Sequence, residues 1–262
     1  MLTTRYVDGA PDWIDLGTPD LDGATAFYGE VLGWGFRSAG PEAGGYGMFE
    51  VDGRTAAGGM TVTGEQGPPA WTVYFQTPDA DATAKAVREA GGTVLLAPMD
   101  VFDLGRTAVL ADSAGAAFGA WQPGKNKGLD VVGEPGALCW TELYTPDVPR
   151  AAAFYDKVFG WETANTPWPG GAFTSARPAG TGEEAMFGGL WPLEADPSES
   201  GRRPRWLVYF EVGDCDAVVA RAGRLGGGTR TEPMSMEGVG RVATLRDPYG
   251  AEFGVVTSEP GT

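Results

Sequence analysis

The phrase AAAFYDKVFGW occupies residues 151–161, and ATAFYGEVLGW, at residues 24–34, repeats it nearer the start of the chain. In both copies an apolar helical pattern carrying adjacent Phe and Tyr ends in Gly-Trp. Extended outward, residues 13–34 and 140–161 match at twelve of 22 positions without a gap. Two further pairs follow in the same order, residues 71–92 with 206–227 and residues 105–121 with 240–256. The repeated unit is therefore a whole domain.

This repeat predicts two tandem domains, residues 9–122 and 137–258, joined by residues 123–136, a linker rich in glycine and charge. Each copy begins with strand-like alternation and passes a Thr-Pro-Asp turn into an amphipathic helix. Short strands follow, then a second strand–helix pass near residue 71 or 206 and three closing strands. We therefore expect an α+β fold in which each domain contains two βαβββ modules.

The composition excludes several classes of function. The chain has 262 residues, 42% of them hydrophobic, and a formal net charge of −16. Because a chain with this negative charge repels phosphates, nucleic acid and anionic membranes are poor partners. No apolar run is long enough to span a membrane, and the first residues lack a signal-peptide pattern. With Cys139 and Cys215 as the only thiols, a reduced, cytoplasmic location is expected.

The chain contains no histidine. It therefore lacks the usual general base near neutral pH, the commonest metal ligand and the Ser-His and Cys-His nucleophile pairs. Any catalysis must use carboxylates, Tyr, Cys, Lys, Arg or a supplied cofactor.

The motifs resemble a known family. The phrase FYxxVxGW after a strand and a Thr-Pro-Asp turn, the strand that begins at Trp71 or Trp206, and the closing GR…DxxGAxFG are similar to those of the vicinal oxygen chelate superfamily. The superfamily includes glyoxalase I, extradiol dioxygenases, fosfomycin-resistance enzymes and bleomycin-binding proteins. The resemblance covers nearly the whole chain, and the tandem arrangement resembles two-domain glyoxalase-like proteins often labelled hydroxylases. It implies that the two modules of each domain form a curled sheet around a cup for a small molecule.

The same resemblance implies a divalent metal held at the base of the cup by His and Glu. Carried over position by position, the ligand sites fall on residues without a suitable donor: Trp13, Thr72 and Gly119 in the first domain, and Trp140, Leu207 and Gly254 in the second. A further ligand position falls near residues 58–59 and 188–189, which are glycines. We therefore expect no metal and no other cofactor, and glyoxalase or ring-cleaving dioxygenase chemistry becomes the less favoured function.

Strand alternation predicts what lines the cup instead. The inward-facing set is expected to contain Trp13 and Trp140 with the acids Asp15 and Glu142, then Thr72, Tyr74, Gln76, Leu207, Tyr209 and Glu211, and on the closing strands Gly119, Trp121, Glu252 and Gly254. Phe75, Phe118, Phe210 and Phe253 occupy the opposite faces and are expected to form core. Aromatic walls with glycines, which are expected to leave open space, suit a planar guest. The alternative is that the aromatic side chains fill a collapsed cup.

Charged residues repeat in both copies. Asp15 and Glu142, each near an indole, are candidates for a general acid or base, together with Tyr74 and Tyr209; hydrogen bonds to neighbouring strands are the alternative. Arg106 and Arg241 each follow a glycine, and they are expected either to form an ion pair with Asp15 or Glu142 or to bind an anionic group on a guest.

Three functions remain open at this stage. The first is a metal-free protein that binds a small aromatic or hydrophobic metabolite, in the manner of sequestration or resistance proteins. The second is a cofactor-free lyase, isomerase or hydroxylase-like enzyme that uses the cup carboxylates and tyrosines, and the third is a role through protein contacts. The expected partner is a small molecule, and the chain is expected to be a monomer that pairs its own domains or a homodimer.

Overall fold

The computed structural model describes residue 2, residues 6–168, residues 171–195, residue 199 and residues 201–259. The first repeat forms two βαβββ modules: β1 (Pro11–Thr18), α1 (Leu21–Leu32), β2 (Gly35–Ser38), β3 (Gly47–Val51) and β4 (Arg54–Thr61), then β5 (Ala70–Gln76), α2 (Ala80–Glu89), β6 (Thr93–Val101), β7 (Gly105–Ala111) and β8 (Ala117–Pro123). Among the described residues, no helix has the length and apolar character needed to cross a membrane.

The second repeat has the same order of elements. Its modules are β9 (Leu138–Thr145), α3 (Val148–Phe159), β10 (Glu162–Trp168), β11 (Gly171–Arg177) and β12 (Gly188–Pro192), then β13 (Arg205–Glu211), α4 (Cys215–Arg224), β14 (Gly228–Met236), β15 (Gly240–Arg246) and β16 (Glu252–Ser258). The predicted βαβββ modules are confirmed in both repeats.

Each repeat contributes one mixed eight-stranded sheet. The strand orders are β2-β3-β4-β1-β5-β8-β7-β6 and β10-β11-β12-β9-β13-β16-β15-β14, so the two sheets share one topology. Within them β1 pairs with β4 and β9 with β12 in parallel, while the hairpins pair antiparallel. The α+β fold class predicted from the sequence is therefore confirmed, whereas the domain boundaries and the cups remain predictions.

Local sequence signals set the ends of the helices. The Asp20 side chain accepts a hydrogen bond from the backbone N–H of Gly23 at 3.0 Å, and Gly33 ends α1 with a φ of 77°. In the second repeat Asp147 and Gly160 do the same for α3. A carboxylate at the N-cap satisfies a backbone N–H, and glycine adopts the left-handed conformation at the C-terminus without strain.

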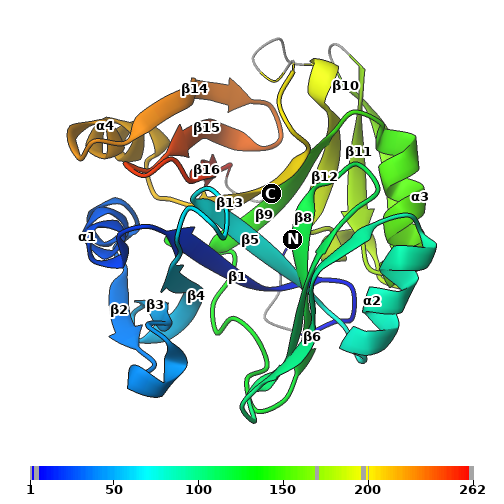
Figure 1. Cartoon of the computed structure of the whole chain (residues 1–262). Helices are drawn as coiled ribbons and strands as arrows, with labels where there is room; N and C mark the ends of the chain where they lie inside the picture. The colour runs from blue at the N-terminus through cyan, green and yellow to red at the C-terminus, as the bar shows by residue number, and fades with distance from the viewer. Residues whose placement is uncertain (1, 3–5, 169–170, 196–198, 200, 260–262) are drawn as a thin grey trace. The chain divides into compact units, whose positions relative to one another are not determined.

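Packing groups the chain into two compact units, each of which takes modules from both repeats. Unit 1 contains Met1–Trp13, Thr72–Gly128 and Trp140–Leu207, and unit 2 contains Ile14–Trp71, Leu129–Cys139 and Val208–Thr262. In unit 1 the helices α2 and α3 lie side by side, and in unit 2 α1 and α4 do so (Figure 1).

The core of unit 1 explains half of the repeated Phe-Tyr phrase. Tyr155 is fully buried and stacks on Trp161 with ring centroids 4.4 Å apart. Its hydroxyl accepts a hydrogen bond from Trp206 Nε1 at 2.9 Å and donates one to Asp112 at 3.3 Å. We call this chain the Trp-Tyr-Asp lock of unit 1. It ties the second repeat's α3 to the turn that precedes β8 of the first repeat.

Unit 2 contains an equivalent lock. Trp71 Nε1 donates to the Tyr28 hydroxyl at 3.1 Å, and this hydroxyl donates to Asp247 at 3.2 Å. Burial is the main cause that raises the pKa of the Tyr28 and Tyr155 phenols well above the usual value, so both keep their protons. The Phe-Tyr phrase thus occurs twice because each compact unit has one of its two tyrosines, Tyr155 or Tyr28, at the centre of its lock. Phe75, Phe118, Phe210 and Phe253, predicted as core, are fully buried, which confirms that prediction.

Candidate functional site

A group of half-buried aromatic side chains lies on one face of the second repeat's first module, within unit 1. Strand β9 alternates, because Thr141 and Leu143 are buried whereas Trp140, Glu142 and Tyr144 are half-buried on the other face. The strand therefore presents an indole, a carboxylate and a phenol in a row.

The neighbouring strands add two more rings to this face. Tyr144 of β9 is in register with Trp191 of β12, so their side chains project from the same side of the sheet. Phe173 of β11 lies between the two indoles, with ring centroids 5.1 Å from Trp191 and 6.3 Å from Trp140. We call these four residues, Trp140, Tyr144, Phe173 and Trp191, the aromatic face.

Polar groups border the aromatic face. The Tyr144 hydroxyl donates a hydrogen bond to Glu142 at 3.0 Å, which holds both side chains in place. The Arg205 guanidinium lies over the Tyr144 ring, 4.8 Å from its centroid, as expected for a cation–π contact. Arg205 also forms an ion pair with Glu199 at 2.7 Å, and Glu199 binds Arg202 at 3.0 Å. Because the Glu199 side chain is only 10% exposed, these ion pairs are shielded from solvent screening.

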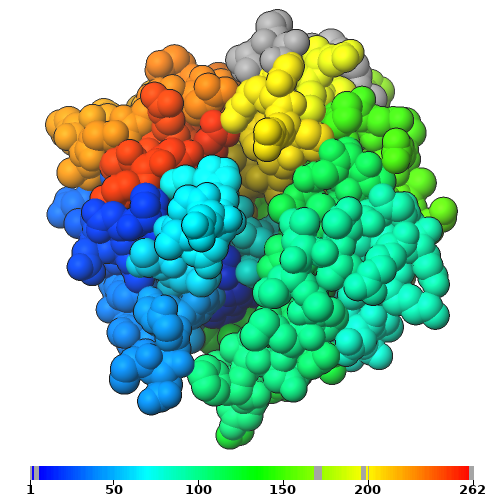
Figure 2. All heavy atoms as spheres, viewed as in Figure 1, coloured from blue at the N-terminus to red at the C-terminus, as the bar shows by residue number. Residues whose placement is uncertain are grey.

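Figure 2 shows yellow atoms, in the colour of residues just before 195, at the molecular surface. Trp140 and Glu142 were predicted from the sequence, whereas Tyr144, Phe173, Trp191 and Arg205 were not. Tyr144 was within reach of the sequence, because it lies two residues after Glu142 and so shares its face. Trp191 and Phe173 carried no such signal, because only the pairing of β9, β12 and β11 brings them to Tyr144.

In the first repeat the acid Asp15 is buried, and the Tyr46 hydroxyl donates a hydrogen bond to it at 3.4 Å. Both predicted acids, Asp15 and Glu142, are thus bound by a phenol, which comes from just before β3 in the first repeat and from β9 itself in the second. Their predicted role in catalysis stays a prediction.

The expected open space at Gly119 and Gly254 is occupied, which corrects that expectation. A Cβ added at Gly119 would lie 1.9 Å from Tyr74 Cδ1, and one added at Gly254 would lie 2.0 Å from Tyr209 Cδ1. Each tyrosine is in register with its glycine, so the ring folds flat over the backbone where no side chain stands. Tyr209 is buried and Tyr74 half-buried.

The remaining predicted cup residues of the first repeat lie in unit 1. Trp13 is buried and Thr72 half-buried. Gln76 is buried and donates from Nε2 to Asp8 at 3.0 Å. Trp121 is buried and donates from Nε1 to the Asn126 carbonyl at 3.2 Å.

The remaining predicted residues of the second repeat include Leu207, which is buried in unit 1. In unit 2, Glu211 accepts hydrogen bonds from the backbone N–H of Ser258 at 3.0 Å and from its hydroxyl at 2.6 Å. Glu252 forms an ion pair with Arg230 at 3.2 Å. Both acids are half-buried.

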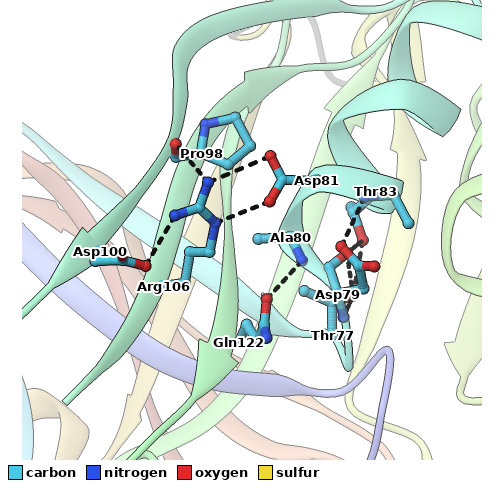
Figure 3. Close-up of polar contacts among 10 residues, drawn as sticks. Thr77, Asp79, Ala80, Asp81, Thr83, Pro98, Asp100, Arg106 and Gln122 are labelled. Carbon is cyan, nitrogen blue, oxygen red and sulfur yellow. Dashed lines mark hydrogen bonds and ion pairs between the residues drawn. The ribbon is translucent and has the colours of Figure 1, made fainter. Parts of the chain in front are cut away.

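Arg106 lies between two carboxylates of unit 1, as Figure 3 shows. It donates to Asp81 at 2.9 Å and to Asp100 at 2.8 Å. Arg241, at the equivalent place in unit 2, binds Asp216 at 2.7 Å and 2.8 Å. The hydrogen bonds that each guanidinium donates to these carboxylates are the main reason that its pKa is raised. The arginines thus form ion pairs with carboxylates other than the predicted Asp15 and Glu142, which corrects that alternative. Binding of a guest anion by these arginines stays a prediction.

The side chains at the inherited ligand positions do not fit a divalent metal. Indole, leucine and glycine offer no donor that such an ion binds well, and tyrosine rings cover the two glycines. Within the described ranges, no three His, Cys, Asp or Glu side chains are grouped so that they can hold a metal ion.

Comparison with known proteins agrees with the fold. A model of the glyoxalase/bleomycin resistance protein/dioxygenase superfamily matches residues 10–119, and one of a glyoxalase-like domain matches residues 140–256. Anthracycline biosynthesis protein DauV of Streptomyces sp. (strain C5) is 40% identical, and the match covers 97% of this chain and 94% of its own length. The chain belongs to the glyoxalase/bleomycin resistance protein/dioxygenase superfamily.

A further relative in sequence and a solved structure are also similar to the chain. "Putative glyoxylase CFP32" of Mycobacterium tuberculosis (strain CDC 1551 / Oshkosh) is 36% identical over 262 residues, 98% of both chains. The 2,3-dioxygenase LapB of Pseudomonas sp. KL28 superposes with a TM-score of 0.63 over 97% of this chain and 96% of its own. At 12% identity LapB supports the fold alone.

Proposed function

We propose that the chain binds a planar aromatic metabolite on the aromatic face of the second repeat, without a metal. The observation that carries this proposal is that Trp140, Phe173 and Trp191 form ring contacts, that Tyr144 is in register with Trp191, and that all four side chains stay half-buried. Rings in a hydrophobic core, such as Tyr155 and Phe118, are fully buried instead. The area that remains accessible on the face offers a flat apolar surface, and burial of such area on a guest stabilises binding.

The polar groups at the border of the face give the site an orientation. Glu142 can accept a hydrogen bond from a hydroxyl on the guest, and Arg205 extends the flat surface over Tyr144. Ligand sites commonly combine apolar walls with a few polar groups in this way. A negative net charge of −16 further favours a neutral or cationic guest over a polyanion.

The names of the relatives support the guest's class. DauV and a second relative, DnrV of Streptomyces peucetius, are described as anthracycline biosynthesis proteins and are each 40% identical to this chain. An anthracycline carries a planar fused-ring system, so it is the natural first probe for the aromatic face. Sequestration of such a compound and presentation of it to an enzyme are both consistent with this proposal.

Titration of tryptophan fluorescence with an anthracycline tests the proposal. We expect saturable quenching, and Trp191→Ala should weaken binding about tenfold, which corresponds to about 1.4 kcal/mol. The matched control is Met60→Ala, because Met60 stands in the first repeat where Trp191 stands in the second. Equal affinities of the two variants, or no saturable quenching, would contradict the proposed site.

A second candidate is a cofactor-free lyase, isomerase or hydroxylase-like enzyme. The hydrogen bond between Tyr144 and Glu142 favours it, because a paired phenol and carboxylate at the edge of a binding surface can transfer a proton. Glu142→Gln distinguishes the two functions. If the variant binds the probe normally but no longer converts a substrate that the wild type turns over, the enzyme is supported. If both proteins bind the probe and neither changes it, the binding protein is supported.

A further inference from the structure

We propose that the chain holds one planar guest, on the second repeat only, and that Tyr144 and Arg205 are the residues that make this repeat competent. This inference rests on the proposed function and adds which repeat acts, the stoichiometry and the residues that decide it. It follows from a comparison of equivalent positions in the two first modules.

The two modules align residue by residue. Glu142 is in register with Gly189 and Tyr144 with Trp191, whereas Asp15 is in register with Gly58 and Gly17 with Met60. The pair Tyr144 and Trp191 of the second repeat is therefore Gly17 and Met60 in the first. Two flat aromatic surfaces have been replaced by a glycine and a flexible thioether side chain.

The cation above the phenol is also confined to the second repeat. Arg205 begins β13, and Ala70 begins β5 at the equivalent position. Without Tyr144 there is no ring for a guanidinium to stack on, and without Arg205 the ring loses its cover. The absence of the Tyr144 ring and the absence of the Arg205 guanidinium therefore belong together. As a result, the first repeat lacks both the aromatic ring and the cation that covers it.

In the first repeat, other residues of the same repeat occupy the place that corresponds to the Tyr144 ring. A Cβ added at Gly17 would lie 3.1 Å from Val62 Cγ1 and 3.8 Å from the Ala70 carbonyl, so the space beside Gly17 is occupied. Tyr46 stands where Phe173 stands in the second repeat, and its hydroxyl is directed to the buried Asp15. Side chains within unit 2 thus close this surface, whereas those of unit 1 leave four rings half-buried.

Phe173 also shows how the second repeat keeps its rings flat. A Cβ added at Gly189 would lie 2.1 Å from Phe173 Cε2, so the phenyl ring rests directly on the backbone of β12. This fixes the Phe173 ring between the indoles of Trp140 and Trp191. A site whose rings are fixed before binding loses little conformational entropy when a planar guest stacks on them.

Calorimetric titration of the intact chain with an anthracycline tests the inference. We expect a stoichiometry of about one guest per chain, and we expect Tyr144→Ala and Arg205→Ala to weaken binding about tenfold and severalfold. Tyr144→Phe, which keeps the ring, should bind within about twofold of the wild type and controls for loss of the fold. Met60→Ala and Val62→Ala, the first-repeat controls, should leave the affinity and the stoichiometry unchanged.

The outcomes separate the two proposals. Two equivalent guests per chain, or a loss of binding in Met60→Ala that matches the loss in Tyr144→Ala, would overturn the single-site inference and leave metabolite binding in place. No heat and no quenching with any planar probe would overturn the proposed function and the single site with it. Near-ultraviolet circular dichroism of each variant excludes unfolding as the cause of lost binding.

Discussion

The two repeats of this chain agree where they build the core and differ where they build the aromatic face. Each repeat supplies the Trp and Tyr of one Trp-Tyr-Asp lock and the Asp of the other, and the distances from Tyr155 and from Tyr28 are nearly the same. On the face of the first module, Tyr144 in one repeat corresponds to Gly17 in the other. The comparison teaches that the buried contacts which join the repeats into compact units are the same in both copies, whereas a half-buried surface differs between them.

Removal of a lock tyrosine should have the largest effect of any change proposed here. Tyr155→Ala leaves a cavity among stacked rings and deprives Trp206 and Asp112 of a buried partner, so we expect a loss of about 3–5 kcal/mol in the free energy of unfolding. Tyr28→Ala should cost a similar amount in unit 2. Urea denaturation measures both, with the exposed Lys85→Ala as the control. A loss of unfolding free energy in only one of the two tyrosine variants would show that the two locks are not equivalent.

The second prediction concerns Asp12 and Cys139, which precede Trp13 and Trp140 at equivalent positions. Asp12 is buried, neither carboxyl oxygen has a hydrogen-bond partner among the described residues, and burial raises its pKa to about 8. The Cys139 thiol instead donates to the Tyr209 carbonyl at 3.4 Å. The folded state therefore holds a proton on Asp12 at pH values where the unfolded chain has released it.

The sign of the pH dependence follows from this difference. Between the unfolded pKa of 3.8 and the folded value of about 8, the folded state binds more protons, so this group makes stability fall as the pH rises. The slope approaches about 1.4 kcal/mol per pH unit within that window and vanishes above it. Asp12→Asn and Asp12→Cys should both flatten the profile of unfolding free energy between pH 5 and pH 8. A slope that is unchanged in both variants would show that other groups cause it.

Much of this fold was predictable from the sequence, because the signals are local. Alternation predicted the strands, Asp20 and Gly33 marked the ends of α1, and the repeated phrase predicted the duplicated modules. The aromatic face was only half predictable. Trp140 and Glu142 share a strand, but Trp191 reaches Tyr144 only through the parallel pairing of β12 with β9, which no short stretch of sequence specifies. The expectation of open space at Gly119 was also wrong, because the Tyr74 side chain on the neighbouring strand β5 fills that space.

The third prediction addresses those covered glycines. A methyl group at Gly119 meets the Tyr74 ring, and one at Gly254 meets the Tyr209 ring, so Gly119→Ala and Gly254→Ala should each cost about 1–3 kcal/mol in the free energy of unfolding. Gly254→Ala should cost more, because Tyr209 is buried and Tyr74 is half-buried. The double variant Gly119→Ala/Tyr74→Ala provides the control. If the ring causes the clash, the alanine at position 119 should cost less in the background that lacks Tyr74.

The smallest effect is expected at the repeated arginines. Arg106 bridges Asp81 and Asp100, whereas Arg241 binds one carboxylate, Asp216. These ion pairs lie at the surface, where water and salt screen the attraction, so Arg106→Ala and Arg241→Ala should lower the Tm only slightly. The loss should shrink further in high salt, and it should be larger for Arg106 because two carboxylates then face each other without a cation. A large and salt-independent loss of Tm, or a loss of probe binding in either variant, would mean that these arginines serve more than the local ion pairs. Normal probe binding in both variants would instead show that neither arginine recognises the guest. All three Arg→Ala substitutions remove the same charge, so a loss of probe affinity in Arg205→Ala alone would be due to the position of Arg205.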